Sequence, residues 1–228
     1  AYPFARQHKK RGREGLSASW FGRMLEFMGV CRIITVDIHS TEIENSFHSL
    51  RLENLHASYQ TIRKLSEIID LESEDIVVVS PDTGAIARNK FYAGHLRCPL
   101  ALIYKERDYS TFSENADKTN IVNTKLLGSV ENKTVFIADD MIGTGGTLIT
   151  AMKYLKGLGA KDIIVGVSLP LFTGDSIQHF DEAYRNGLFS RIIGSNAVYH
   201  SKTLLGKEWY VCASVSNLFA RIIYRLQH

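Results

Sequence analysis

Two kinds of hydrophobic pattern alternate along the chain. Short apolar runs rich in β-branched residues predict buried strands, and longer segments with apolar residues at helical spacing predict helices between them. This alternation is typical of an α/β protein whose parallel sheet is covered by helices on both faces, and such sheets bind ligands at the carboxyl ends of their strands. The predicted strands are 32–37, 76–80, 100–105, 135–138, 162–169 and 210–215, and the predicted helices are 16–28, 57–69, 84–95, 147–156, 174–184 and 216–227.

The most specific pattern lies where one predicted strand meets a helix. The apolar run 135–138 leads into Asp139 and Asp140, and a Gly-Thr-Gly-Gly-Thr loop at 143–147 precedes the helix. Glycines let backbone N–H groups approach an anion, and the helix N-terminus adds a positive dipole end. Carboxylates suit ribose hydroxyls or a magnesium ion. The segment therefore predicts a site for a ribose and its phosphate; the alternative is a plain strand-turn-helix with solubilising aspartates.

Polar side chains also follow three other predicted strands. Asp37 and His39 lie two residues apart, so an extended backbone puts them on one face, where they could hold a divalent metal. The alternative is a histidine satisfied by local hydrogen bonds. Asp82 lands at the rim of the sheet before a helix that Gly84 opens, and it could instead be a helix cap. Lys105 ends the third strand.

A polar segment follows Lys105. Residues 108–120 have almost no aliphatic side chains and no periodicity, and a loop of that length is typical of a functional lid or of disorder. Lys105 and Arg107 at its root are cations that could swing onto a phosphate-bearing substrate. Each motif is weak by itself, but their placement on successive strand ends predicts one site.

Composition limits the class of protein. The chain has 228 residues, 45% hydrophobic and 22% charged, with a net charge of +3, which fits one large domain or two smaller ones. The basic run 8–13 lacks interleaved aromatic residues, so we expect a solvated segment and no nucleic-acid binding. Cys31, Cys98 and Cys212 are scattered and predict core thiols in a reducing compartment. Without a signal peptide or a long apolar run, we expect a cytoplasmic protein that does not contact membranes.

Taken together, the motifs resemble the ribose-phosphate pyrophosphokinase family, also called phosphoribosyl pyrophosphate synthases. The resemblance covers nearly the whole chain. Arg6-Gln7 in "YPFARQHKK" is similar to the ATP-contacting pair of the family, and "VDIHSTEIENSF" is similar to its histidine signature. "ADDMIGTGGT" alone marks the wider phosphoribosyltransferase group. Lys105 and Arg107 look like the cations of the catalytic loop, and they make the resemblance specific to the synthase.

The resemblance implies that ATP and ribose 5-phosphate react to give phosphoribosyl pyrophosphate and AMP. It implies a Mg²⁺ ion at His39 and Asp82, with Asp37 beside them, catalysis by Lys105 and Arg107, and a homo-oligomer, either a hexamer or its dimer unit. No Walker-type Gly-Lys-Ser/Thr is present, so ATP would be held differently from a P-loop kinase. The implied ribose-5-phosphate ligands are Arg107, Asp139, Asp140, Gly143, Thr144, Gly145, Gly146 and Thr147.

Four positions depart from the family pattern. Glu42 and Glu44 add negative charge near the implied metal, in a segment where the family usually has glutamines. Glu106 replaces an arginine of the catalytic loop, and Gly143 stands where an aspartate is frequent. None of these changes removes an implied catalytic position, and we expect them to alter affinity and regulation.

The resemblance also implies two phosphoribosyltransferase-like domains. Residues 57–204 are expected to form the C-terminal domain, and 1–56 with 205–228 the remainder of an N-terminal domain that is incomplete at its start. Family members carry further residues before the Arg-Gln pair, so we expect the natural protein to extend upstream of Ala1. We expect the 228 residues alone to be poorly soluble or inactive toward ATP, and still to recognise ribose 5-phosphate.

Two other functions remain open. A nucleobase phosphoribosyltransferase would share the glycine-rich loop, but it would have no use for Arg6-Gln7 or the strand-end lysine. A non-catalytic, synthase-like regulatory protein would need none of the reactive side chains. Their presence argues against it, and they are His39, Asp82, Lys105 and Arg107.

Overall fold

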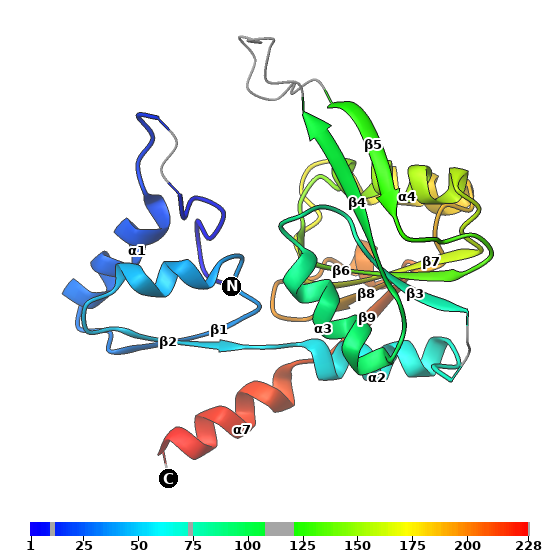
Figure 1. Ribbon diagram of the computed structural model, residues 1–228. Helices are drawn as coiled ribbons and strands as arrows, with labels where there is room; N and C mark the ends of the chain where they lie inside the picture. The colour runs from blue at the N-terminus through cyan, green and yellow to red at the C-terminus, as the bar shows by residue number, and fades with distance from the viewer. Residues whose placement is uncertain (10–11, 73–74, 108–120, 228) are drawn as a thin grey trace.

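The computed structural model of the chain describes residues 1–9, 12–72, 75–107 and 121–227. Its main feature is a seven-stranded sheet with the order β5-β4-β3-β6-β7-β8-β9 (Figure 1). Neighbouring strands run parallel except at one edge, where β5 pairs antiparallel with β4. The strands are β3 (Ile76–Ser80), β4 (Leu100–Arg107), β5 (Ile121–Leu127), β6 (Thr134–Ile142), β7 (Asp162–Pro170), β8 (Arg191–Ser195) and β9 (Tyr210–Ala213).

Helices cover both faces of this sheet. One face packs against α2 (Ser58–Ile68) and α3 (Ile86–Leu96), and the other against α4 (Gly146–Gly157), α5 (Ser176–Arg185) and α6 (Lys202–Leu205). Because no face of the central strands meets water, those strands are apolar along their length, and every residue of β3 is buried. The structure confirms the predicted α/β fold with a mostly parallel sheet.

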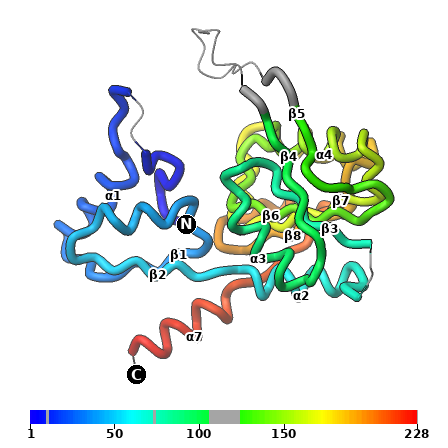
Figure 2. The backbone as a smooth tube through the Cα atoms, viewed as in Figure 1, coloured from blue at the N-terminus to red at the C-terminus, as the bar shows by residue number. Residues whose placement is uncertain are grey.

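The chain before α2 forms a smaller N-terminal region. It contains α1 (Ser17–Phe27), β1 (Arg32–Val36), a 3-10 helix η1 (Thr41–Ser46) and β2 (Arg51–Leu55), which pairs parallel with β1. Figure 2 shows the backbone running from β2 directly into α2 of the larger body. The last helix, α7 (Ser216–Gln227), extends away from the seven-stranded sheet, and none of its residues is buried (Figure 1). The small core of the N-terminal region contains Tyr2, Ala5, Ala18, Ile38, Ile43 and Leu52.

All the predicted strands and helices are present, with small shifts at their ends. The largest difference is in β6, which continues to Ile142, so Asp139 and Asp140 lie inside the strand and not after it. The elements without a prediction are β2, β5, β8, α6 and η1, all short or at an edge of a sheet. The predicted loop 108–120 lies outside the described residues.

Two further expectations meet the structure here. The division into domains stays a prediction, but β9 pairs with β8, so residues 210–213 lie in the seven-stranded sheet and not with the N-terminal remainder. The prediction of three core thiols is wrong for Cys31, which is exposed, while Cys98 and Cys212 are partly buried. In the described part of the chain, no helix is long and apolar enough to cross a membrane.

Candidate active site

The candidate site lies at the carboxyl end of β6, where the strand meets the loop before α4. Asp139 and Asp140 are neighbours in β6, and the side chain of Asp139 is 29% exposed while that of Asp140 is only 7% exposed. The two carboxylates share one partner, Arg88, but only Asp140 also bonds to His39.

Arg88 joins the two carboxylates from the facing helix. Its Nη1 lies 3.8 Å from Oδ1 of Asp139 and 3.6 Å from Oδ1 of Asp140. The sequence analysis missed Arg88. The available signal was its place in the first turn of a helix that follows a strand-end aspartate, since such a turn faces the ligand edge of the sheet.

The two aspartates titrate in opposite directions. Burial, together with the neighbouring carboxylate of Asp140, raises the pKa of Asp139 to about 7. Burial also acts to raise the pKa of Asp140, but the hydrogen bond from His39 and the nearby Arg88 outweigh it and lower that pKa to about 2. Asp140 therefore remains a carboxylate, and Asp139 is the group that can take up a proton near neutral pH.

His39 brings the N-terminal region to this edge of the sheet. Its Nδ1 lies 2.6 Å from Oδ2 of Asp140, across the boundary between the two regions. Since Asp140 is ionised and can only accept, His39 Nδ1 carries the proton, and in the neutral ring Nε2 is left with a free lone pair. This is the arrangement that a carboxylate gives to a histidine that binds a metal. The ring of His8, two residues from Arg6, lies edge-on at 5.4 Å from the ring of His39.

The loop before α4 has the features of an anion site. Gly145 has a φ of 78°, and a Cβ there would collide with the ring of Phe180. A Cβ on Gly146 would meet nothing within 4 Å, and no side chain caps the N-terminus of α4. The first N–H groups of the helix are therefore not bonded to a capping side chain and can meet an anion. Thr144 and Thr147 are exposed beside them.

Asp37 has a different role from the predicted one. It is buried, and its carboxylate accepts hydrogen bonds from Nδ1 of His56 at 2.7 Å, from the backbone N–H of Ala57 at 3.0 Å and from Oγ of Ser168 at 2.5 Å. Burial acts to raise the pKa of Asp37, but the three hydrogen bonds outweigh it and lower that pKa. The hydrogen bond to Asp37 raises the pKa of His56. Both oxygens of Asp37 are engaged, so it fixes β1 against β7 and offers little to a metal.

The other predicted site residues are placed as follows. Asp82 is exposed, and its Oδ1 accepts the N–H of Ala85 at 3.0 Å in the turn before α3; no side chain caps the helix itself. Lys105 lies on β4, which is separated from β6 by β3. The side chain of Arg107 lies outside the described part. Arg6 and Gln7 are exposed near the start of the chain.

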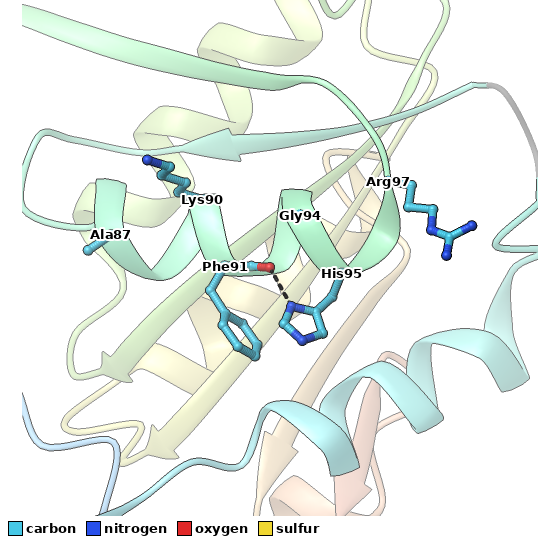
Figure 3. A pocket seen from close by; sticks show the side chains of 6 residues that line it. All are labelled: Ala87, Lys90, Phe91, Gly94, His95 and Arg97. Atoms are coloured by element: carbon cyan, nitrogen blue, oxygen red, sulfur yellow. Dashed lines mark hydrogen bonds between the residues drawn. The ribbon is translucent and has the colours of Figure 1, made fainter.

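A hollow on the outer face of α3 takes no part in this site. Figure 3 shows its lining side chains along the exposed side of the helix, with His95 hydrogen-bonded to the carbonyl of Phe91. Among the described residues, no group of three or more His, Cys, Asp and Glu side chains is arranged to hold a metal ion. The magnesium site therefore stays a prediction.

Comparison with known proteins agrees with this architecture. The phosphoribosyl transferase domain family matches residues 48–202. The chain is 35% identical over 202 residues to a ribose-phosphate pyrophosphokinase of Mycoplasma pneumoniae, and 32% identical over 231 residues to ribose-phosphate pyrophosphokinase 2 of Schizosaccharomyces pombe, covering 67% of that protein. The chain belongs to the ribose-phosphate pyrophosphokinase family.

A solved member of this family has the same fold. The phosphoribosylpyrophosphate synthetase of Mycobacterium smegmatis superposes with a TM-score of 0.83 at 30% identity, over 99% of this chain and 68% of that one. The resemblance drawn from the motifs is thus confirmed. The chain spans 58% of the length of the Mycoplasma pneumoniae relative, and 66% of a relative in Thermosipho africanus that is 34% identical.

Proposed function

We propose that the site transfers a diphosphate group from ATP to the C1 hydroxyl of ribose 5-phosphate, giving phosphoribosyl pyrophosphate and AMP. The observation that carries the proposal is the hydrogen bond between His39 and Asp140. It joins the histidine of the N-terminal motif to the carboxylates of the phosphoribosyltransferase motif, beside the uncapped start of α4. A nucleobase phosphoribosyltransferase would need only the second of these motifs.

In this proposal the protein positions the two substrates and neutralises charge. The amides of residues 143–147 hold the 5-phosphate at the positive end of α4. Asp139, the more exposed carboxylate, accepts hydrogen bonds from the ribose hydroxyls, with Arg88 beside it. The sugar hydroxyl attacks the β-phosphorus in line with the departing AMP, so no side-chain nucleophile is required. Lys105 and Arg107 stabilise the charge that develops on the transferred group.

Two of the three predicted metal ligands suit Mg²⁺. His39 keeps Nε2 available because Asp140 holds its other nitrogen, and Asp82 retains a second carboxylate oxygen while Oδ1 accepts the N–H of Ala85. Magnesium bound there would supply positive charge to the phosphates. Asp37 would not bind the ion; its hydrogen bonds to His56 and Ser168 would hold the backbone that carries His39 in place.

The wider assignments rest on the family and stay proposals. We propose that Arg6 and Gln7 contact ATP. The next residue, His8, packs its ring against that of His39, which brings this segment close to the site. We also propose a homo-oligomer, as the resemblance implies, and a cytoplasmic location without nucleic-acid or membrane partners. The separate C-terminal domain of residues 57–204 is a proposal as well, adjusted by the place of β9.

An assay of AMP formation and calorimetry with ribose 5-phosphate together test the proposal. We expect AMP to form from ATP only when ribose 5-phosphate and Mg²⁺ are both present. Calorimetry should detect the binding of ribose 5-phosphate without ATP. Consumption of phosphoribosyl pyrophosphate with a nucleobase, and no AMP from ATP, would instead favour the phosphoribosyltransferase alternative.

A further inference from the structure

Two neighbouring strands of the sheet, β3 and β6, stop pairing beside the site. β3 pairs with β6 only from Ile76↔Thr134 to Val78↔Phe136, although β6 continues to Ile142 and stays paired with β7 to its end. Beyond Phe136, the side of β6 that faces β3 therefore loses its strand partner. A backbone N–H and C=O left there without hydrogen bonds would be costly, because this part of the strand is buried.

The side chain of Asn89 fills this opening. Its Oδ1 accepts the N–H of Ala138 at 2.9 Å, and its Nδ2 donates to the carbonyl of Ala138 at 2.9 Å. Nδ2 also donates to the carbonyl of Ala85, one turn earlier in α3, at 2.9 Å. Asn89 is fully buried. Its amide replaces a missing strand residue, because a side-chain amide offers the same donor and acceptor as a peptide group.

The residues next to this contact are those of the site. Arg88 precedes Asn89 on the helix, and Asp139 follows Ala138 on the strand. The distances from Arg88 to the two carboxylates, 3.8 Å and 3.6 Å, are too long for hydrogen bonds. The ion pairs therefore do not fix their own geometry. The amide of Asn89 bonds the helix that carries Arg88 to Ala138, the strand residue before Asp139.

Asparagine is otherwise a poor choice at this position. It is unfavourable inside a helix, since its amide competes with backbone hydrogen bonds, and burial requires that each of its polar atoms find a partner. An aliphatic residue would suit a helix packed on a sheet better. The hydrogen bonds to Ala138 give a reason for the amide.

We propose that Asn89 is a positioning residue that sets the separation between Arg88 and the Asp139–Asp140 pair. The inference rests on the proposed function only in taking ribose 5-phosphate as the ligand of that pair. Asn89 touches no substrate; it acts through the backbone of the strand and helix that carry these charges.

Two variants and one control test the proposal. Asn89→Asp keeps the shape of the side chain but removes the donor to two carbonyl groups, and Asn89→Leu removes all three hydrogen bonds and keeps an apolar fit. The control is Ser195→Ala, which removes one buried and one partly buried hydrogen bond of a β8 side chain, two strands away from β6. Thermal unfolding of all three shows which variants lose comparable stability.

The first measurement needs no ligand. We expect amide hydrogen exchange at Ala138 to become at least about tenfold faster in Asn89→Leu, relative to Ile164 of the same core, and to keep its rate in Ser195→Ala. Unchanged protection of Ala138 in both Asn89 variants would overturn the proposal. This readout holds even if the wild-type chain fails to bind ribose 5-phosphate, an outcome that would count against the proposed function alone.

The second measurement asks whether Asn89 acts through Arg88. We expect Asn89→Asp or Asn89→Leu to raise the Kd for ribose 5-phosphate by about tenfold, with little change in Ser195→Ala. In an Arg88→Ala background the same substitution should raise this Kd by a much smaller factor, because the charge that Asn89 positions is absent. Fully additive losses would show a general structural effect and refute the positioning role.

Discussion

The seven-stranded sheet and the N-terminal region are stabilised in different ways. The large sheet has apolar cores on both faces, and residues such as Phe136 and Ile164 are completely buried. The N-terminal region has one small core, while Trp20 and Phe27 of α1 are 62% and 94% exposed. Burial of apolar area dominates folding, so the large sheet carries most of the stability.

The two regions meet through a small apolar contact and two hydrogen bonds, one buried and one partly buried. Val36 and Ala57 pack against Leu169 and Val215. Asp37 bonds to Ser168, and His39 bonds to Asp140. The proposed phosphate loop and ribose-binding carboxylates thus belong to the large sheet, whereas the proposed metal ligand His39 reaches them from the N-terminal region. This comparison predicts that ribose-5-phosphate binding depends on the large sheet and that metal and ATP functions depend on the junction.

The largest effect is expected at the loop before α4. Gly146→Val should abolish ribose-5-phosphate binding, a loss of at least about a hundredfold, because the side chain fills the space in front of the helix amides. The fold should survive, since a Cβ there meets no atom within 4 Å. Calorimetry and thermal unfolding measure the two quantities.

Gly145→Val is the matched comparison for that prediction. Gly145 has a positive φ and lies against Phe180, so the same substitution one residue earlier should lower the melting temperature as well as binding. Unchanged binding in Gly146→Val would reject the phosphate loop, whatever the behaviour of Gly145→Val.

The next effect concerns turnover. In the AMP-forming assay, Lys105→Ala should lower kcat by at least about a hundredfold with a modest change in KM, because we propose that its charge acts mainly on the transition state. Steady-state rates with both substrates measure this split. A loss of affinity for both substrates with kcat intact would show that Lys105 serves binding. Lys125 of β5, which pairs through the backbone with Tyr104, provides the control as Lys125→Ala.

A smaller effect is expected at the junction. Asp37→Asn removes a buried charge that accepts three hydrogen bonds, and should lower the free energy of unfolding by about 2–3 kcal/mol. Hydrogen exchange should rise mainly in β1 and β2. The control is Asp181→Asn, whose partners Lys207 and Trp209 both lie in the large body, so its effect should stay near α5 and β9. Equal loosening of β1 in both variants would contradict the proposed role of the junction.

The sequence predicted the elements of the large sheet well because they have strong periodicity. β3 was predicted with its observed bounds, and the loop before α4 was located from its glycines. The contacts between distant segments could not be predicted. The pairing of His39 with Asp140 joins residues 101 positions apart, and no local pattern records it. Asn89 was missed for the same reason, since its role depends on where β3 and β6 separate.

The site assignments show that sequence patterns do not predict the partner of each polar side chain. Asp37 and His39 share a strand end, and the pattern treats them alike, yet Asp37 is buried against Ser168 while His39 reaches the site. The predicted alternation assumes an extended backbone, but β1 ends at Val36 and Asp37 has a φ of 43°, so the period of two does not hold here and the two side chains meet different partners. Asp82 bonds the N–H of Ala85 in the turn before α3 through one carboxylate oxygen, and its role as a metal ligand stays a prediction.

The smallest effect tests the N-terminal region by itself. One oxygen of Glu26, Oε1, accepts the backbone N–H groups of His48, Ser49 and Leu50 at 2.8, 2.6 and 2.7 Å. These bonds lower the pKa of Glu26 from 4.5 to about 2. Because the pKa of Glu26 is lower in the folded state, its carboxylate stabilises the folded region above pH 4.5. This stabilisation is lost as the pH falls from 4.5 toward 2. Hydrogen exchange should therefore rise at residues 48–50 over this range, before β3 or β6 responds.

Glu26→Gln should remove the pH dependence, whereas Glu67→Gln, an exposed control on α2, should leave it in place. Simultaneous loosening of β6 and residues 48–50 would show that the two regions unfold as one unit.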